Sequence, residues 1–281
     1  MKQRRFSRSI ISGKRFPRDT KEGKKVKLST GSIIIIVVAT LLGLFLGNGL
    51  DGSFNTQTGN AWLWALGVGI ISGVGAYFAV VNFKPATTAA GVSTTTQFED
   101  PKFAKFLFQD PRSAALWLPI RLFMGLDFLS AGIHKFGDPK WMSDGTALLG
   151  YWTNAVKVDQ TGKGVITYDW WRNFLQMMID SGSSVWFAKL ITFGEMLIGL
   201  GLIVGGLVGI AAFFGAVMNM SFLLSGSVSV NPIFLTLGIL LIMGWKVAGW
   251  IGLDRVLLPA LGTPWKAGAL FNREQSPQPI S

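Results

Sequence analysis

The sequence contains no cysteine and only one histidine, His134, among its 281 residues. Without thiols the chain can form no disulfide, no thiolate metal site, no iron–sulfur cluster and no thiol relay. A single imidazole is too few for a bis-histidine haem or for most zinc sites. We therefore expect no bound metal, haem or iron–sulfur cluster, so that a redox function would need an organic carrier or a partner's cofactor.

Acidic residues are also scarce, because 15 Asp and Glu stand against 26 Lys and Arg and give a formal net charge of +11. Eleven of the basic residues lie within the first 27 positions. A basic cluster before a hydrophobic run is typical of a cytoplasmic arm that follows the positive-inside rule and contacts anionic lipid. We expect the lipid bilayer, and not nucleic acid, as the partner of this arm, with specific binding of another macromolecule as the alternative.

Long hydrophobic runs dominate the rest of the chain, in which hydrophobic residues make up 49%. Several runs are uncharged and long enough to span a bilayer as helices, which predicts an integral membrane protein. The first two runs carry Gly43/Gly47 and Gly69/Gly73, a spacing that lets two helices pack closely. We expect six spans, at about 32–50, 61–81, 114–134, 185–204, 207–225 and 233–252.

The predicted fold is an all-α integral membrane protein, with a four-helix transmembrane bundle preceded by two extra N-terminal transmembrane helices. An even number of spans puts both termini on one side of the membrane, and the basic segments mark that side as cytoplasmic. The expected segments are a basic cytoplasmic arm at 1–31, two transmembrane helices within 32–81, a cytoplasmic linker at 82–113, a four-helix domain at 114–257 with an outer cap at 135–184, and a cytoplasmic tail at 258–281.

The cap is too polar to span a membrane, yet it contains one short helix, predicted at about 168–180. Trp170, Trp171, Phe174, Met177 and Met178 of this helix indicate an apolar face. We expect that face to lie on the membrane surface.

The third span carries ionisable side chains, which are costly within a membrane and therefore mark a candidate site. At about 100° per residue, Asp127 and His134 share one face of this helix. A second, narrow stripe is formed by Arg121, Gly125, Phe128, Gly132 and Lys135.

The fourth span offers candidate partners for these charges. Residue numbers 121 and 195 sum to 316, as do 127 and 189, so one antiparallel register would pair Arg121 with Glu195 and Asp127 with Lys189. Asn219 of the fifth span comes out at a similar depth, near mid-membrane. Two interpretations follow: the charges are interhelical ties, or they form a polar seam that lines a cavity for a small ligand.

Several of these segments together resemble the DoxX family. The stripe from Arg121 to Lys135 is followed by FGDPKWM, by WFAKLITFGEMLIGLGLIVG around Glu195, by MNMSFLLSGSVSVNP around Asn219, and by the closing GLDR at 252–255. The resemblance covers about 116–257 and implies a four-helix membrane bundle in a prokaryotic plasma membrane. DoxD-like members of the family are membrane subunits of thiosulfate:quinone oxidoreductase.

The resemblance implies a subunit for the quinone-linked oxidation of a small inorganic sulfur anion such as thiosulfate, with a second redox subunit as a candidate partner. A quinone would enter the bundle, and an anion would be received at an outer basic mouth. The candidate residues are Asp127, Glu195 and Arg121 for catalysis, Asn219 and Phe128 for quinone binding, and His134, Lys135 and Lys189 for the anion.

A non-enzymatic function is the alternative. The chain would then be a membrane scaffold that docks a soluble redox or stress-defence partner through the cap and the basic arm. In that case the charge pairs would only hold the helices together.

Overall fold

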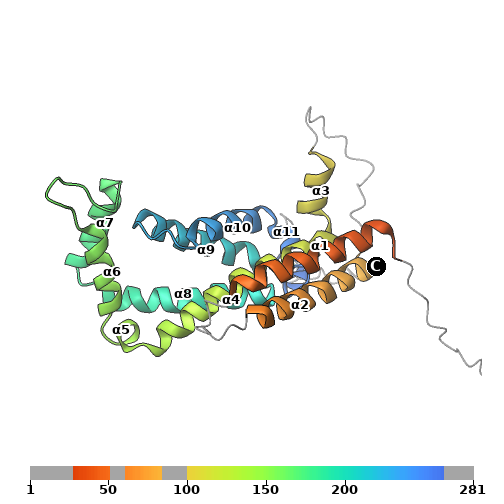
Figure 1. Ribbon diagram of the computed structural model, residues 1–281, viewed down its shortest axis with the longest axis horizontal. Helices are drawn as coiled ribbons and strands as arrows, with labels where there is room; N and C mark the ends of the chain where they lie inside the picture. The colour runs from red at the N-terminus through yellow and green to blue at the C-terminus, as the bar shows by residue number, and fades with distance from the viewer. Residues whose placement is uncertain (1–27, 51–60, 84–99, 263–281) are drawn as a thin grey trace, which may run out of the picture.

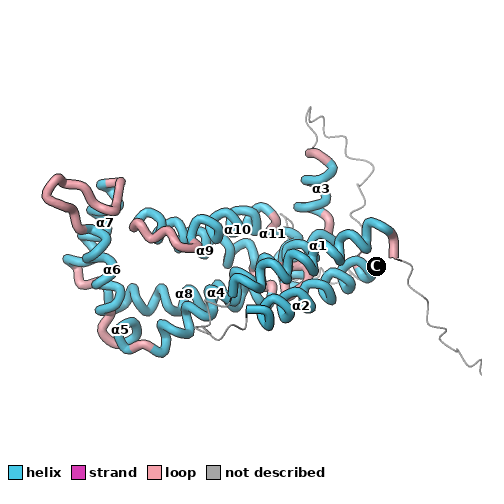
Figure 2. The backbone as a smooth tube through the Cα atoms, in the orientation of Figure 1, coloured by secondary structure: helices cyan, strands magenta, loops and turns pink. Residues whose placement is uncertain are grey.

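The computed structural model describes residues 28–50, 61–83 and 100–262, and within these ranges the chain is helical, with no β-strand (Figure 1). Figure 2 shows that loops join the helices mainly at their ends. The predicted all-α membrane fold is confirmed to this extent: four helical segments are long and apolar enough to cross a membrane, namely Thr30–Gly47, Ala61–Asn82, Pro111–Gly137 and Ser184–Val204. Most of the predicted arm, part of the linker and most of the tail lie outside the described residues.

Helices α1 (Thr30–Gly47) and α2 (Ala61–Asn82) pack against each other, and both also pack against α4 (Ala114–Gly137). The predicted glycine contacts are confirmed. A Cβ atom at Gly43 would lie 2.8 Å from the carbonyl oxygen of Val68, and one at Gly47 would lie 2.6 Å from that of Trp64. These glycines therefore set the distance between the two helix backbones.

We expect Gly47→Ala to separate α1 from α2, because the new methyl group would meet backbone that cannot rotate away. Overpacking of this kind costs about 1–3 kcal/mol of unfolding free energy. Gly67→Ala on α2 is the matched control, since a Cβ there meets nothing within 4 Å. Thermal unfolding in detergent measures both variants, and equal melting temperatures would show that the contact is not tight.

Helices α4 and α8 (Ser184–Val204) are antiparallel neighbours, and glycines again fix their register. A Cβ at Gly125 would lie 3.0 Å from the carbonyl oxygen of Gly199, and one at Gly132 would lie 3.1 Å from that of Thr192. The close approach makes these backbones, and not the charged side chains, decide which residues of the two helices are level.

Two shorter apolar helices, α9 (Val208–Leu224) and α10 (Asn231–Met243), follow α8 and pack against each other (Figure 1). The predicted continuous span at 233–252 is wrong, because the helix ends at Met243. Gly244 follows, with the ring of Trp117 3.0 Å from where its Cβ would be. The chain continues as the short α11 (Trp245–Ala248) and then as α12 (Asp254–Leu261).

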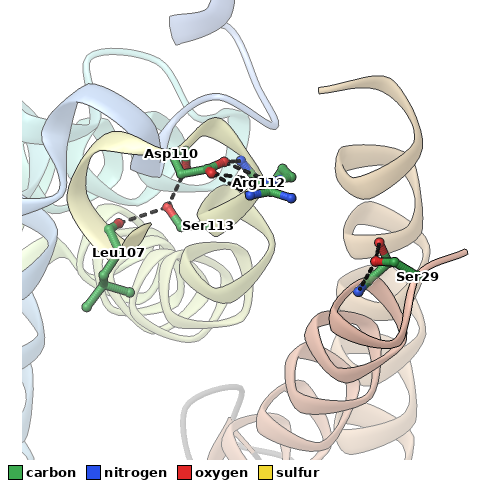
Figure 3. Close-up of polar contacts among 6 residues, drawn as sticks. Ser29, Leu107, Asp110, Arg112 and Ser113 are labelled. Atoms are coloured by element: carbon green, nitrogen blue, oxygen red, sulfur yellow. Dashed lines mark hydrogen bonds and ion pairs between the residues drawn. The ribbon is translucent and has the colours of Figure 1, made fainter. Parts of the chain in front are cut away.

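At the end of the bundle where α11 lies, the short helix α3 (Lys102–Gln109) joins α4 through the single turn η2 (Pro111–Ser113). Figure 3 shows this corner: the guanidinium of Arg112 donates to the carboxylate of Asp110, at 2.7 Å for the shortest contact, and the hydroxyl of Ser113 lies 2.8 Å from the carbonyl oxygen of Leu107. The indole of Trp117 donates to the same carbonyl at 3.0 Å. The corner thus attaches α3 to the first turn of α4.

The segment between α4 and α8 forms a cap with its own hydrophobic core. It contains α5 (Pro139–Met142), α6 (Thr146–Val156) and α7 (Asp169–Asp180), and the last of these matches the predicted short helix. Leu148, Trp152 and Leu175 of the cap pack with Ala188 and Ile191 of α8. In Figure 1, α6 and α7 stand across the end of the bundle, at a steep angle to α4 and α8.

The turn that leads from α6 towards α7 is organised by Asp159. Its Oδ1 accepts hydrogen bonds from the hydroxyl and the backbone N–H of Thr161, at 2.7 and 2.8 Å, and from the N–H of Lys163 at 2.9 Å. The hydroxyl of Thr161 contributes most to holding the pKa of this exposed carboxyl below its ordinary value, followed by the N–H of Lys163. All three bonds favour the ionised form.

We expect Thr161→Ala to raise the pKa of Asp159 towards that of a free aspartate. A depressed pKa gives the turn stability that is present above the ordinary aspartate value of about 3.9 and is lost as the pH falls through the lower folded value. Carboxyl-carbon NMR titration of Asp159 measures the shift. Thr153→Ala, which removes an exposed hydroxyl from α6, is the control and should leave the titration unchanged.

Candidate functional site

The predicted stripe on α4 faces the helices that pack against it, which confirms the helical spacing argument. Gly125 and Gly132 contact α8, while Phe128 packs beside Ile198 and Gly215 and against the ring of Phe234, with ring centroids 5.9 Å apart. At the two ends of the stripe lie Arg121 and Lys135, about 21 Å apart along the helix. They belong to two separate polar sites.

The first site, which we call the Lys135 cluster, consists of Lys135, Glu195, Asp127 and Trp141. The ammonium of Lys135 donates to Oε1 of Glu195, and the same Nζ lies 4.9 Å from the centroid of the Trp141 ring. Glu195 is only 2% exposed, in the middle of an apolar helix, whereas the side chain of Lys135 is 19% exposed. The pair therefore connects a buried carboxylate with the cap side of the bundle.

Glu195 is incompletely satisfied. Among the described residues its second oxygen, Oε2, has no hydrogen-bond partner. Asp127 of α4 is near enough for its charge to act on Glu195. Two carboxyl groups thus share one buried region with one ammonium, and a buried polar atom without a partner is uncommon enough to mark a place for a ligand or a proton.

The second site, the Arg121 junction, joins α4 to the ends of other helices. Arg121 is 1% exposed, and its guanidinium donates to the carbonyl oxygens of Ala248, Ile251 and Ile203, at 2.7, 3.1 and 3.5 Å. Ile203 and Ala248 lie in the last turns of α8 and α11, where carbonyl groups lack helical partners and the helix dipole is negative. The buried cation is held by helix ends and not by a carboxylate.

Asp254 completes the junction with the opposite charge. Its carboxylate, 1% exposed, accepts from the backbone N–H groups of Leu207 and Val208 at 2.5 and 3.0 Å, so it caps the positive end of α9. Burial is the larger influence on Asp254 and raises its pKa, while these two N–H groups lower it. Leu207 has φ of 51°, an unusual backbone conformation for leucine that the two hydrogen bonds hold in place.

The predicted ion pairs Arg121–Glu195 and Asp127–Lys189 are wrong. Contacts of α4 with α8 join residues 125 and 199, which sum to 324, and residues 132 and 196, which sum to 328. The observed register is therefore displaced by about ten residues, or about 15 Å, from the predicted sum of 316. Glycine packing decides the register, and Lys135 is the residue that reaches Glu195.

The remaining predicted site residues do not join the Lys135 cluster. The side-chain amide of Asn219 donates to the carbonyl oxygen of Gly215 at 2.8 Å, within its own helix, and Phe128 is buried in the apolar core. His134 is exposed, and Lys189 forms no ion pair among the described residues. Of the predicted residues, the structure brings together Lys135, Glu195 and Asp127.

An apolar groove of about 560 Å³ lies between α8 and α9. Gly194 and Ile198 line it from α8, and Met218 and Ser221 line it from α9. Glu195 is not in the lining, although two of its neighbours on α8 are. Such a groove fits a long apolar ligand, whereas no group of three or more metal-binding side chains occurs in the described part of the chain.

Sequence reasoning missed Trp141 and Asp254 as members of these sites. A signal for the Arg121 junction is present in the glycines, because a Cβ at Gly205 would lie 2.9 Å from the guanidinium carbon of Arg121, and one at Gly252 would lie 2.6 Å from the carbonyl oxygen of Val204. Glycines grouped near the ends of apolar helices indicate close backbone approach, and a buried cation is one reason for it.

Evolutionary and structural relationships give no further guide to these sites. Comparison of the chain with protein-family models, with curated protein sequences and with solved structures finds no match. What the protein does must therefore be inferred from the chemistry of its own residues.

Proposed function

We propose that this protein is a DoxX-like membrane subunit that takes part in the quinone-linked oxidation of a small inorganic sulfur anion such as thiosulfate. The observation that supports the proposal is the buried Glu195, which has one oxygen paired with Lys135 and the other without a hydrogen-bond partner among the described residues. A membrane protein retains such a group at a cost of several kcal/mol, and proton transfer is a common reason for it.

The groups of the Lys135 cluster suit the proton steps of this reaction. Oxidation of two thiosulfate ions to tetrathionate releases two electrons and forms one S–S bond, and a bound quinone would accept those electrons together with two protons. Glu195 and Asp127 are the residues that would pass the protons, and Lys135, at the cap side, would stabilise their ionised forms. Arg121 has a structural role in this proposal, because its guanidinium is engaged with carbonyl oxygens.

The groove between α8 and α9 is where the chain's own side chains fit a quinone. Its lining is apolar, which suits an isoprenoid tail, and Ser221 brings a hydroxyl group to it. Gly194 and Ile198 of this lining flank Glu195 in the sequence, so the proton-carrying residue and the groove share one stretch of α8.

Purified protein in lipid nanodiscs tests the proposal directly. With thiosulfate and a soluble quinone we expect quinol to form, and we expect Glu195→Gln to lower the rate at least tenfold, as is usual for loss of a general acid or base. Thr236→Val, on the exposed side of α10, is a control that should keep the rate. If the protein reduces no quinone and carries none when extracted from membranes, the proposal is wrong.

A scaffold function is the second candidate, and the Arg121 junction favours it. Arg121 and Asp254 serve to join helix ends, and Lys135 with Glu195 can be read in the same way, as an interhelical tie. The chain would then dock a soluble redox or stress-defence partner. Glu195→Gln distinguishes the two candidates: it lowers turnover in an assembled complex if the first holds, and it lowers only the yield of assembled protein if the second holds.

We also propose that α9 and α10 serve as the fifth and sixth spans of a prokaryotic plasma-membrane protein with both termini in the cytoplasm. At about 1.5 Å per residue these helices are about 26 and 20 Å long, less than the usual hydrocarbon thickness of about 30 Å. Local thinning of the bilayer, or the cap at one end and α11 and α12 at the other, would supply the difference. Protease protection of tags at each terminus tests the orientation.

A further inference from the structure

We infer that α7 lies in the interface between membrane and water, with the surface of uncharged phospholipid as its partner. Three large apolar side chains of this helix are uncovered: Trp170 is 60% exposed, Met177 56% and Phe174 36%. Helix α7 therefore does not bury all of its apolar surface within the cap.

The exposed apolar side chains form one flank of the helix. At about 100° per residue, Trp170, Phe174 and Met177 fall within an arc of about 60°. On one side of this arc lies the buried face, with Leu175 and Met178 in the core of the cap. On the other side lie the exposed polar residues Asp169, Asn173, Gln176 and Asp180.

This sequence of buried, apolar and polar faces is that of a helix lying in a membrane surface. The apolar flank is next to the face that packs onto the bundle, and the polar face points the opposite way, towards water. A helix exposed to water on its whole free side would not gain from Trp and Met on one flank. Figure 1 agrees, because α7 crosses the end of the bundle and does not run along it.

Printed contacts connect this flank with the end of a membrane helix. The indole of Trp171 donates to the hydroxyl of Ser225, just beyond the end of α9, at 3.0 Å, and the ring of Phe174 is stacked on Trp171, with centroids 5.2 Å apart. Trp170 lies against Trp171 with centroids 5.6 Å apart. The flank is thus continuous with the outer end of α9, at the depth where aromatic residues of membrane proteins gather.

The charges of α7 select the kind of lipid. The helix carries Asp169, Asp180 and one cation, Arg172, whose guanidinium already donates to Asp169 at 2.7 Å and to the carbonyl oxygen of Ile166 at 2.5 Å. No free cation of this helix remains to bind an anionic headgroup. The partner is therefore the boundary of headgroups and acyl chains in a zwitterionic lipid such as phosphatidylcholine, and contact should not depend on anionic lipid or on salt.

The natural absence of cysteine makes a clean test possible, because a single introduced cysteine can carry a spin label. We compare Met177→Cys with Gln176→Cys, and Phe174→Cys with Asn173→Cys, in nanodiscs of phosphatidylcholine. Each pair places the label on neighbouring residues of the apolar flank and the polar face. We expect the labels at 177 and 174 to be relaxed several-fold more by oxygen, and less by a water-soluble nickel chelate, than those at 176 and 173.

Two results would overturn the inference. Equal access of the nickel chelate to both members of each pair would show that the flank faces water. Protection at 177 and 174 that persists in detergent without lipid, and that increases with protein concentration, would show that a second copy of the chain covers the flank. Circular dichroism of each labelled variant verifies that the cap has folded, and the same pattern in nanodiscs with added anionic lipid is expected.

Discussion

Arg121→Met is expected to lower the free energy of unfolding by about 3–5 kcal/mol, because it removes one of two opposite buried charges and leaves the other in place. The guanidinium now satisfies carbonyl oxygens of Ile203, Ala248 and Ile251, which cannot reach water. Each hydrogen bond to a charged group contributes about 1.5–3 kcal/mol, and the carbonyl groups left behind keep their desolvation cost. The variant should lose the contacts among α4, α8 and α11 together.

Lys246→Met is the matched control for this prediction. Lys246 is also a cation at the same end of the bundle, on α11, but it is exposed and lies over the ring of Trp245 at 5.8 Å. An exposed cation over a ring contributes about 0.5–1 kcal/mol. Unfolding curves in mixed micelles measure both variants, and a loss at Arg121 no larger than that at Lys246 would show that the junction does not stabilise the bundle.

Asp254→Asn tests the other half of the junction. The amide keeps one acceptor for the N–H groups of Leu207 and Val208, yet it removes the negative charge that caps α9 and balances Arg121. We expect a smaller loss than for Arg121→Met, of about 1–2 kcal/mol, in the range of a lost helix cap. A loss equal to that of Arg121→Met would indicate that the two charges act as one unit.

Periodicity and glycine spacing predicted a large part of the fold. The stripe from Arg121 to Lys135, the close contact of Gly43 and Gly47 with α2, and the helix α7 all follow from local sequence, because each depends on residues of one helix. Hydropathy identified the four long apolar helices for the same reason. These features need no knowledge of which helices are neighbours.

The pairing of charges could not be predicted in the same way. A sum of residue numbers assumes that opposite charges choose the register, but Gly125, Gly132 and Gly199 bring the two backbones together at positions of their own. Backbone carbonyl groups, which carry no signal in a sequence, are what Arg121 binds. The end of α10 at Gly244 likewise depends on the ring of Trp117, which is distant in the chain.

The Lys135–Glu195 pair is expected to show strong coupling in a double-mutant cycle. Lys135→Met alone should cost about 3–5 kcal/mol, because it leaves the carboxylate of Glu195, 2% exposed, without its counter-charge. Glu195→Gln alone should cost less, since the side chain of Lys135 is 19% exposed and can turn towards water. The double variant, which buries no unpaired charge, should be more stable than Lys135→Met.

The asymmetry between the two single variants carries the argument about what the site is for. If the pair were only an interhelical tie, the double variant would restore stability and any quinone reduction with it. If Glu195 carries a proton, the double variant regains stability while the rate stays at the low level of Glu195→Gln. Unfolding curves and quinol formation measured on the same four proteins separate these outcomes, and additive losses of stability would show that Lys135 and Glu195 are not coupled at all.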